Sequence, residues 1–423
     1  MDKSRMWTII DGTKYDISDF VSWHPGGEDL VMLAAERDST EMFYSYHLNT
    51  KKAQKVLSRL PVLEEGLPRG LYTHESPLYQ ILKKRVRAHL KENKLPTQRH
   101  DWGRTATIMG SLAVLYVLTV FFALWWLTPL MGVMMAVAGL AIQHDGNHGS
   151  FSKDSKLNKW AGMVDELIGG STLMWRHQHV VSHHAYTNDY EHDRDSVGAW
   201  PVIRNNPAMP WMFHMRFQFI YAPFVYSTIA IFYPIADTIN LIMRKYQTVP
   251  LQPLRPGDLI CFFVGKFVYA MLFLVIPYLV MGPDFLTMFY LPSMLVGGAY
   301  LGCLLLASHN THINEFNVRT GDWAETMIRS TANWSNDSKL WYFFSGGLNF
   351  HIEHHLFPGI SHANFPGIAP IIKQTCEEHG LPYHHFNGGW AIFISHLKLL
   401  YRLGKKPPEG SSLMKADGQP VTF

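Results

Sequence analysis

The stretch QHDGNHGSF (residues 143–151) follows directly on an apolar segment at about 129–143. Two further stretches, HVVSHH (179–184) and HIEHH (351–355), also lie near long apolar segments. Residues three or four apart share one face of a helix, so each stretch can direct two or three imidazoles at one point. Neutral imidazole suits iron, copper, zinc and nickel. Eight such histidines are too many for one ion and about right for two, so the sequence predicts a two-metal centre. They are His144, His148, His179, His183, His184, His351, His354 and His355.

Composition indicates a membrane protein with little affinity for nucleic acid. Hydrophobic residues make up 47% of the 423 residues, and only 17% are charged, below the soluble average of about 25%. The net charge of +3 predicts no nucleic-acid partner. The three cysteines are far apart and predict neither a disulfide framework nor a cysteine-based metal site. The N-terminus lacks the apolar stretch of a signal peptide, so we expect membrane entry through internal spans.

Five apolar segments are candidates for crossing the membrane. If all three clusters share one site, the chain must cross an even number of times before His351. Segment 217–242, which contains Pro223, Pro234 and Asp237, is the best candidate for lying at the interface instead. The turns between the other spans carry no Lys or Arg, which places the clusters and both termini in the cytosol. The expected spans are 106–126, 129–143, 259–281 and 285–308.

The N-terminal 70 residues have the pattern of a separate soluble domain. Trp7-Thr-Ile-Ile followed by Asp11-Gly12 predicts a strand and a turn. His24-Pro-Gly-Gly follows, and Pro25 keeps His24 out of a helix interior while the glycines allow close approach of a flat ligand. With His47, His24 can fill both axial positions of a haem, which then transfers electrons instead of binding oxygen.

These features resemble two families. Residues 5–62 resemble cytochrome b5, which implies haem b with His24 and His47 as axial ligands. The three histidine stretches, with their flanks QHVVSHHAYTN (178–188) and GGLNFHIEHHLFP (346–358), resemble the boxes of membrane fatty-acid desaturases. The combination resembles the front-end subgroup. It implies a small α+β haem domain fused to an all-α integral membrane domain with four transmembrane helices and a cytosolic histidine-box cap.

The resemblance also implies domain boundaries and a metal-ligand set. We expect a haem domain at 1–70, a linker with an interfacial helix at 71–104, a desaturase domain at 105–400 and a tail at 401–423. The eight histidines would bind two iron ions, with one further ligand from the end of the last membrane helix. His309 and His312 are the candidates, and we favour His312 because it lies nearer the level of the boxes.

The implied reaction is oxygen-dependent desaturation of a fatty acyl lipid, either acyl-CoA or phospholipid-bound. O2 is a co-substrate, NADH-cytochrome b5 reductase is the expected electron donor, and the endoplasmic reticulum membrane is the expected location. The sequence near the first box and the stretch Ser361-His-Ala-Asn-Phe-Pro resemble those of Δ6 and Δ5 enzymes acting on polyunsaturated chains. The alternatives are a sphingolipid long-chain-base Δ8 desaturase, a fatty acyl hydroxylase and, from another class, a metal transporter with a haem sensor. A transporter tends to bind metal near mid-bilayer, whereas these clusters lie at or beyond the apolar ends.

Several other polar residues are candidates for supporting roles. Acidic side chains of the haem domain are candidates for a rim that receives a basic electron donor. Carboxylates near the boxes are candidates for orienting the imidazoles. The first position of the third box is His351, where most front-end desaturases have Gln. The rim candidates are Glu28, Asp29, Glu36, Asp38 and Glu41, and the orienting candidates are Asp145, Asp189, Asp193 and Glu353.

Overall fold

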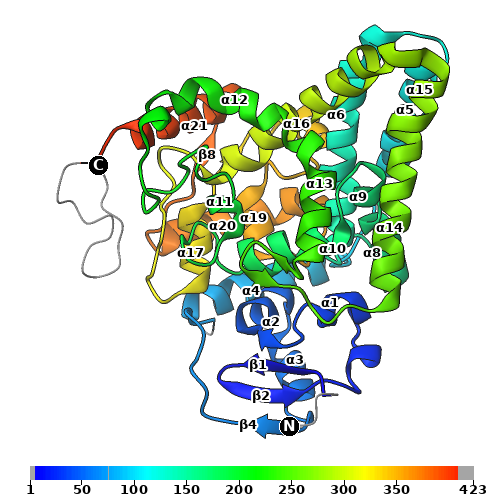
Figure 1. Cartoon of the computed structure of the whole chain (residues 1–423). Coiled ribbons are helices and arrows are strands. Elements are labelled where there is room, and N and C mark those ends of the chain that lie inside the picture. Colours follow the sequence, from blue (N-terminus) through cyan, green and yellow to red (C-terminus); the bar gives the residue numbers. More distant parts are fainter. Residues whose placement is uncertain (1–4, 75, 408–423) are drawn as a thin grey trace.

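The computed structural model describes residues 5–74 and 76–407. A small N-terminal domain lies against one end of a larger helical domain (Figure 1). From the opposite side of that helical domain, a group of long helices extends away from the N-terminal domain. This agrees with the predicted fold class of a cytochrome-b5-like domain followed by an all-α domain.

The N-terminal domain is a four-stranded sheet with short helices on it. The strand order is β3-β1-β2-β4, with β1 and β3 parallel and the other pairs antiparallel. The predicted strand and turn are confirmed: Asp11 and Gly12 join β1 to β2 with φ of 52° and 75°, the left-handed values that a two-residue hairpin turn requires. The elements are β1 (Trp7–Ile10), β2 (Thr13–Asp16), η1 (Val21–Trp23), α1 (Glu28–Met32), β3 (Arg37–Asp38), α2 (Thr40–Tyr46), α3 (Thr50–Leu57) and β4 (Val62–Glu64).

Helix α4 (Pro77–Glu92) joins the two domains. The Ser76 hydroxyl accepts a hydrogen bond from the Tyr79 amide, which caps the helix start, and Pro77 is at the first turn. Its apolar face is buried against Trp323, Ile368 and their neighbours in the largest core cluster. The expectation of an interfacial helix is therefore wrong for α4, because protein side chains already cover the face that would lie on a membrane.

Four helical segments are long and apolar enough to cross a membrane. A fifth candidate is the pair Phe213–Ser227 and Ile229–Ile242, which is bent by 72°. The predicted number of four spans agrees with the straight segments, and the bend falls inside the segment expected not to cross. The four are Trp102–Val120, Trp125–Asn147, Pro256–Asp284 and Leu286–His309.

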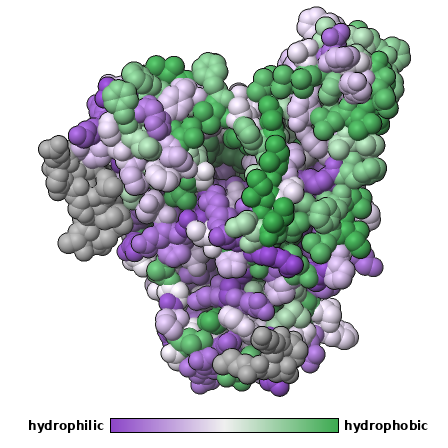
Figure 2. Space-filling model, in the orientation of Figure 1, coloured by the Kyte–Doolittle hydropathy of each residue, from purple (hydrophilic) through white to green (hydrophobic). Residues whose placement is uncertain are grey.

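These spans pack through close backbone contacts and expose apolar side chains outward. Gly132 of α6 faces α16 so closely that a Cβ there would lie 2.2 Å from the Ser293 carbonyl oxygen. Phe263 and Phe267 of α14 are more than half exposed, and Figure 2 shows a green apolar surface on this part of the molecule. The main elements are α5 (Trp102–Val120), α6 (Thr128–Ala138), α12 (Gln218–Ser227), α13 (Ile229–Ile242), α14 (Pro256–Ala270), α15 (Ile276–Met281) and α16 (Leu291–His309).

Short helices form a polar cap between the spans and the N-terminal domain (Figure 1). Figure 2 shows hydrophilic side chains concentrated in this middle band. The cap ends with α21 (Gly389–Gly404), so most of the proposed tail lies outside the described residues. Its other elements are α8 (Ser155–Gly162), α9 (Val164–Leu167), α10 (Thr172–Trp175), α11 (Arg194–Val197), α17 (Trp323–Ser330), α18 (Lys339–Phe344), α19 (His351–Leu356) and α20 (Phe365–Glu378).

Candidate metal and haem sites

The first box begins where the second apolar span leaves the helix bundle. A π-helical turn, η3 (Gly139–Gln143), links α6 to α7 (His144–Asn147). His148 is the C-cap of α7, and its backbone amide donates to the His144 carbonyl oxygen at 3.0 Å. His144 and His148 therefore lie one turn apart, with ring centres 4.5 Å from each other.

The second box is π-helical, which the sequence did not predict. In η4 (Arg176–His183), the His184 amide donates to the His179 carbonyl oxygen at 2.9 Å, a bond to the fifth residue back. This wider turn brings Nε2 of His179 within 3.1 Å of Nε2 of His184. Single π-helical turns are rare and occur often at functional sites.

The third box forms α19, which begins at His351. Nε2 of His351 lies 2.6 Å from Nε2 of His309, and Nε2 of His183 lies 2.9 Å from the same atom. His309 is the last residue of α16. The elements η4, α16 and α19, which are far apart in the sequence, thus meet at the C-terminal end of α16.

The histidines form two adjacent groups. In the first group, His144, His148, His179 and His354 each offer a nitrogen within 4.8 Å of the others, and in the second His183, His309 and His355 do the same. His184 connects them, because it forms a further such group with His354 and His355. All of these side chains are buried. These clusters of buried imidazole nitrogens could hold metal ions.

Neighbouring side chains hold several imidazoles of the cluster through Nδ1, and some Nε2 atoms have no partner. The Nδ1 atoms of His148, His183 and His355 contact the Tyr46 hydroxyl, the Asp193 carboxylate and the Thr187 hydroxyl at 2.5, 3.0 and 3.0 Å. Within the described residues, several buried Nε2 atoms have no hydrogen-bond partner. Outer-sphere partners of this kind fix the ring and the tautomer of a metal ligand. The donor set therefore fits a metal. The unpartnered imidazole atoms of the cluster are Nε2 of His144, His148, His354 and His355 and Nδ1 of His184 and His309.

Electrostatics in this site favour neutral imidazoles with one exception. Burial and the neighbouring histidines hold the pKa of His355 well below its usual range. Burial also lowers the pKa of His183, but the charges of Asp193 and Asp195 outweigh it, so the net pKa of His183 is raised. Metal binding requires the neutral form of imidazole. Asp193 and Asp195 are therefore the carboxylates that act on the His183 imidazole.

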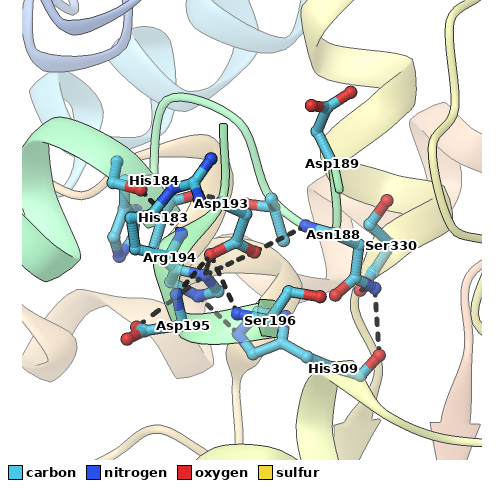
Figure 3. Close-up of polar contacts among 12 residues, drawn as sticks. His183, His184, Asn188, Asp189, Asp193, Arg194, Asp195, Ser196, His309 and Ser330 are labelled. Carbon is cyan, nitrogen blue, oxygen red and sulfur yellow. Dashed lines mark hydrogen bonds and ion pairs between the residues drawn. The ribbon is translucent and has the colours of Figure 1, made fainter. Parts of the chain in front are cut away.

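Asp193 is the carboxylate that connects the cluster to its surroundings (Figure 3). Its Oδ2 accepts from His183 Nδ1 at 3.0 Å and from the Asn188 amide at 2.8 Å. Its Oδ1 accepts from the backbone amides of Asp195 and Ser196 at 2.9 and 3.2 Å, which caps α11. Asp193 is fully buried. It therefore fixes His183, as expected for an orienting carboxylate.

The other three carboxylates contact different partners. Asp145 accepts from His362 Nδ1 at 2.5 Å, Asp189 pairs with His192 and Arg319, and Glu353 accepts from Tyr383 and Asn333. The expectation that these three orient box histidines is wrong, because their oxygens are directed at residues outside the cluster. Asp195, which the sequence analysis did not select, lies 3.4 Å from His179 Nδ1.

His309 lies in the cluster and His312 does not. The helix ends at His309, and the chain then turns at Asn310, which has a non-helical φ of −113° and ψ of 59°. Three residues on, His312 is exposed, and its Nδ1 lies 2.7 Å from the Ser395 hydroxyl of α21. The preference for His312 is therefore corrected in favour of His309.

The N-terminal domain brings its two candidate haem ligands close together, with their ring planes at 88° to each other. The ring centres of His24 and His47 are 6.2 Å apart. Imidazole nitrogens bind a metal at about 2 Å, so two rings on opposite sides of one ion have centres about 6 Å apart. Both Nδ1 atoms contact backbone carbonyl oxygens, of Gly27 at 3.3 Å and of Phe43 at 2.7 Å, which leaves each Nε2 for the metal.

The surroundings of this histidine pair also fit a haem. The pair lines a cavity of about 1440 Å³ that reaches the edge of the first box. A Cβ at Gly26 would lie 2.8 Å from the His24 ring, so this position requires glycine. Burial, followed by the charge of His47, lowers the pKa of His24 to about 4, which keeps the imidazole neutral. Apolar side chains lining the cavity include Ile17, Phe20, Val31, Phe43, Leu57 and Leu60.

The expected acidic rim is largely turned toward the helical domain. Asp29 pairs with Arg255 at 2.6 Å, and Glu28 pairs with the same guanidinium at 2.9 Å. Glu41 is buried, and its Oε2 accepts from the Tyr186 hydroxyl at 3.2 Å. The rim prediction is wrong for these three residues, because their carboxylates hold the two domains of this chain together.

Comparisons with known proteins agree with this geometry. The family model described as fatty acid desaturase matches residues 121–387, which is more than half of the chain. The chain belongs to the fatty acid desaturase family. A second model, described as a cytochrome b5-like heme/steroid binding domain, matches residues 1–64. The predicted family and enzyme class are confirmed: the chain is an oxidoreductase of the front-end type, a desaturase with a fused cytochrome b5 domain.

Relatives from several organisms match this desaturase over nearly its full length. It is 32% identical over 433 residues to an acyl-lipid (8-3)-desaturase of Physcomitrium patens, covering 94% of this chain and 88% of the relative. It is 31% identical over 434 residues to acyl-lipid (8-3)-desaturase B of Dictyostelium discoideum, covering 96% and 92%. A chloroplastic acyl-lipid (7-3)-desaturase of Chlamydomonas reinhardtii is 30% identical over 428 residues, covering 96% and 82%.

Proposed function

We propose that this desaturase introduces a Δ5 or Δ6 cis double bond into a polyunsaturated acyl chain, using two iron ions in the histidine cluster. The observation that carries the proposal is the pair of adjacent imidazole cages with inward, unpartnered nitrogens. Bound iron would supply the activation of O2 and the removal of two hydrogens from the acyl chain. The protein's residues place and protect that chemistry.

The two irons would share the nine histidines unequally. One group is His144, His148, His179 and His354, and the other is His183, His309 and His355. His351 contacts His309 and completes the second group, while His184 lies between the two. In this set His309 takes the place first assigned to His312. The first group, the second group with His351, and His184 between them together include all nine histidines.

We propose that the acyl chain approaches His144 from the membrane side. A narrow cavity of about 50 Å³ lies beside His144 and is lined by apolar residues of α6, α13 and α16. Its side chains include Met135, Leu140, Met294 and Leu301, and Tyr233 and Trp175 also line it. A substrate there would lie beside the histidine cluster among mostly apolar side chains, together with Gln143, Asp165 and Ser293.

The acyl carrier and the orientation complete the proposal. The names of several relatives describe acyl-lipid substrates, which favours a lipid-bound chain here over acyl-CoA. We place the enzyme in the endoplasmic reticulum membrane with the cap, the haem domain and both termini in the cytosol. An NADH-cytochrome b5 reductase would reduce the haem held by His24 and His47.

Expression in yeast fed with defined polyunsaturated fatty acids tests the reaction. We expect a new cis double bond on the carboxyl side of the existing ones, found in phospholipids before the acyl-CoA pool. His354→Ala, at matched protein level, is the inactive control. A hydroxylated product, or a product confined to sphingoid bases, would overturn the assignment.

Cysteine labelling tests the orientation. Lys373 of α20 and Asp284, in the turn between the last two spans, are both exposed. In microsomes we expect an impermeant maleimide to label Lys373→Cys and not Asp284→Cys. The reverse pattern would place the histidine cap on the lumenal side.

A further inference from the structure

One side chain of the haem domain contacts a histidine of the metal cluster directly. The Tyr46 hydroxyl lies 2.5 Å from Nδ1 of His148, and the two rings are nearly parallel with centres 6.0 Å apart. Nε2 of His148 is buried without a hydrogen-bond partner among the described residues and belongs to the first imidazole group. Tyr46 therefore holds this imidazole from its outer side.

Tyr46 is also the immediate neighbour of His47, the candidate haem ligand. Helix α2 ends at Tyr46, and His47 is its C-cap. The His47 ring is fixed by its Nδ1 contact with the Phe43 carbonyl oxygen at 2.7 Å. One peptide unit, one tyrosine side chain and one hydrogen bond thus connect the two metal-binding histidines.

We propose that Tyr46 couples the haem to the iron pair, as a positioning residue that holds His148 and completes a bonded route between them. This rests on the proposed use of the two histidine sites. Bound haem, once reduced, would supply one electron, and the iron pair held by the histidine cluster would accept it. Tyr46 itself is not oxidised, and no bond to it forms or breaks.

The second tyrosine at the domain boundary provides a matched control. Tyr186 also donates a hydrogen bond across the boundary, to Glu41 at 3.2 Å, and it follows His184 by two residues. Among the described residues, its hydroxyl makes no hydrogen bond to an imidazole of the cluster. Loss of either hydroxyl removes one contact between the domains, but only Tyr46→Phe removes the contact with His148.

The test compares Tyr46→Phe and Tyr186→Phe in the full-length chain loaded with haem and iron. Haem reoxidation is followed by stopped-flow absorbance after the reduced protein is mixed with O2 and acyl lipid, and iron and haem per chain are measured separately. We expect reoxidation to slow by about tenfold or more in Tyr46→Phe, the scale of losing an outer-sphere partner of a metal ligand. Haem content, iron content and haem potential should match the wild type, and Tyr186→Phe should react at the wild-type rate.

A bypass measurement separates coupling from a structural defect. Dithionite with a small mediator reduces the iron directly, and one turnover is then started with O2. Tyr46→Phe should form product normally under these conditions. Four outcomes would overturn the proposal. They are haem reoxidation at the wild-type rate in Tyr46→Phe, equal slowing in both variants, loss of iron from Tyr46→Phe, and failure of that variant to form product in the bypass measurement. If His148 were not an iron ligand at all, His148→Ala would keep full iron content, and the proposed function would fail separately.

Discussion

Replacing Asp193 by Asn separates the orienting role of this carboxylate from its structural role. In the wild type, one oxygen accepts from His183 Nδ1 and the other caps α11. Asn keeps only one acceptor. If that acceptor stays on the cap, the amide NH2 faces the His183 and Asn188 donors. If it turns toward His183, the cap is lost, which costs about 1 kcal/mol.

The larger expected effect is on metal affinity. Loss of an outer-sphere partner costs about 10–100-fold in metal affinity or activity, which is about 1.4–2.7 kcal/mol. Asp193 is fully buried and binds His183 without a bridging group. We therefore expect the upper part of this range for the site that contains His183, with little change at the other.

The assay is iron retention during titration with a chelator, measured as iron per chain, with thermal unfolding in detergent as a parallel readout. Asp189→Asn is the control, because Asp189 is a buried carboxylate that pairs with His192 and Arg319 and not with the cluster. We expect Asp193→Asn to lose about one iron at a chelator concentration that leaves Asp189→Asn fully loaded. Equal retention in both variants would refute the argument that Asp193 fixes an iron ligand.

Three further predictions concern the domain boundary and the third box. Burial raises the pKa of Glu41 from 4.5 to about 7, so the folded state holds a proton that the unfolded state has lost. The free energy of unfolding should therefore fall by about 3 kcal/mol at most as pH rises from 4.5 to 7. Glu41→Gln should flatten this pH dependence in thermal unfolding, and an unchanged dependence would contradict the argument. Arg255→Met removes the ion pairs with Asp29 and Glu28, and the Arg255 side chain is 23% exposed. We expect the free energy of unfolding to fall by about 2 kcal/mol, between the values for exposed and buried ion pairs. An unchanged unfolding midpoint would mean that these pairs do not stabilise the docking of the two domains. His351→Gln should keep substantial desaturation because Gln offers a carbonyl oxygen and an amide hydrogen bond at this position, whereas His351→Ala should lose most of it. A fully active Ala variant with two irons would make His351 a bystander.

The sequence predicted the features that depend on local spacing. The turn at Asp11-Gly12, the paired His24 and His47, and the convergence of the three boxes follow from strand, loop and helix periodicity. The number of straight apolar spans follows from the length of the segments. The turn and the spans are decided locally, and each histidine box has its own short spacing pattern, where composition and pattern carry most of the information.

What the sequence did not predict depends on tertiary packing. The choice between His309 and His312 is decided by where α16 ends and by the turn at Asn310, and apolar pattern defines such boundaries poorly. The pairing of Asp29 with Arg255 joins residues 226 positions apart. From sequence alone, acidic residues that pair with the helical domain of the same chain therefore look the same as acidic residues that bind a separate protein. The π-helical second box departs from the spacing of an ordinary helix, so the contact of His179 with His184 was not anticipated.

The metal content of the purified, full-length enzyme tests the central claim most directly. After expression with ample iron and haem precursor, elemental analysis and the haem spectrum should give two non-haem irons and one haem per chain. His309→Ala should lose non-haem iron, while His312→Ala, changed at the exposed histidine, should retain both. A wild-type chain holding zinc or one iron, or a His309→Ala chain that still holds two, would contradict the account.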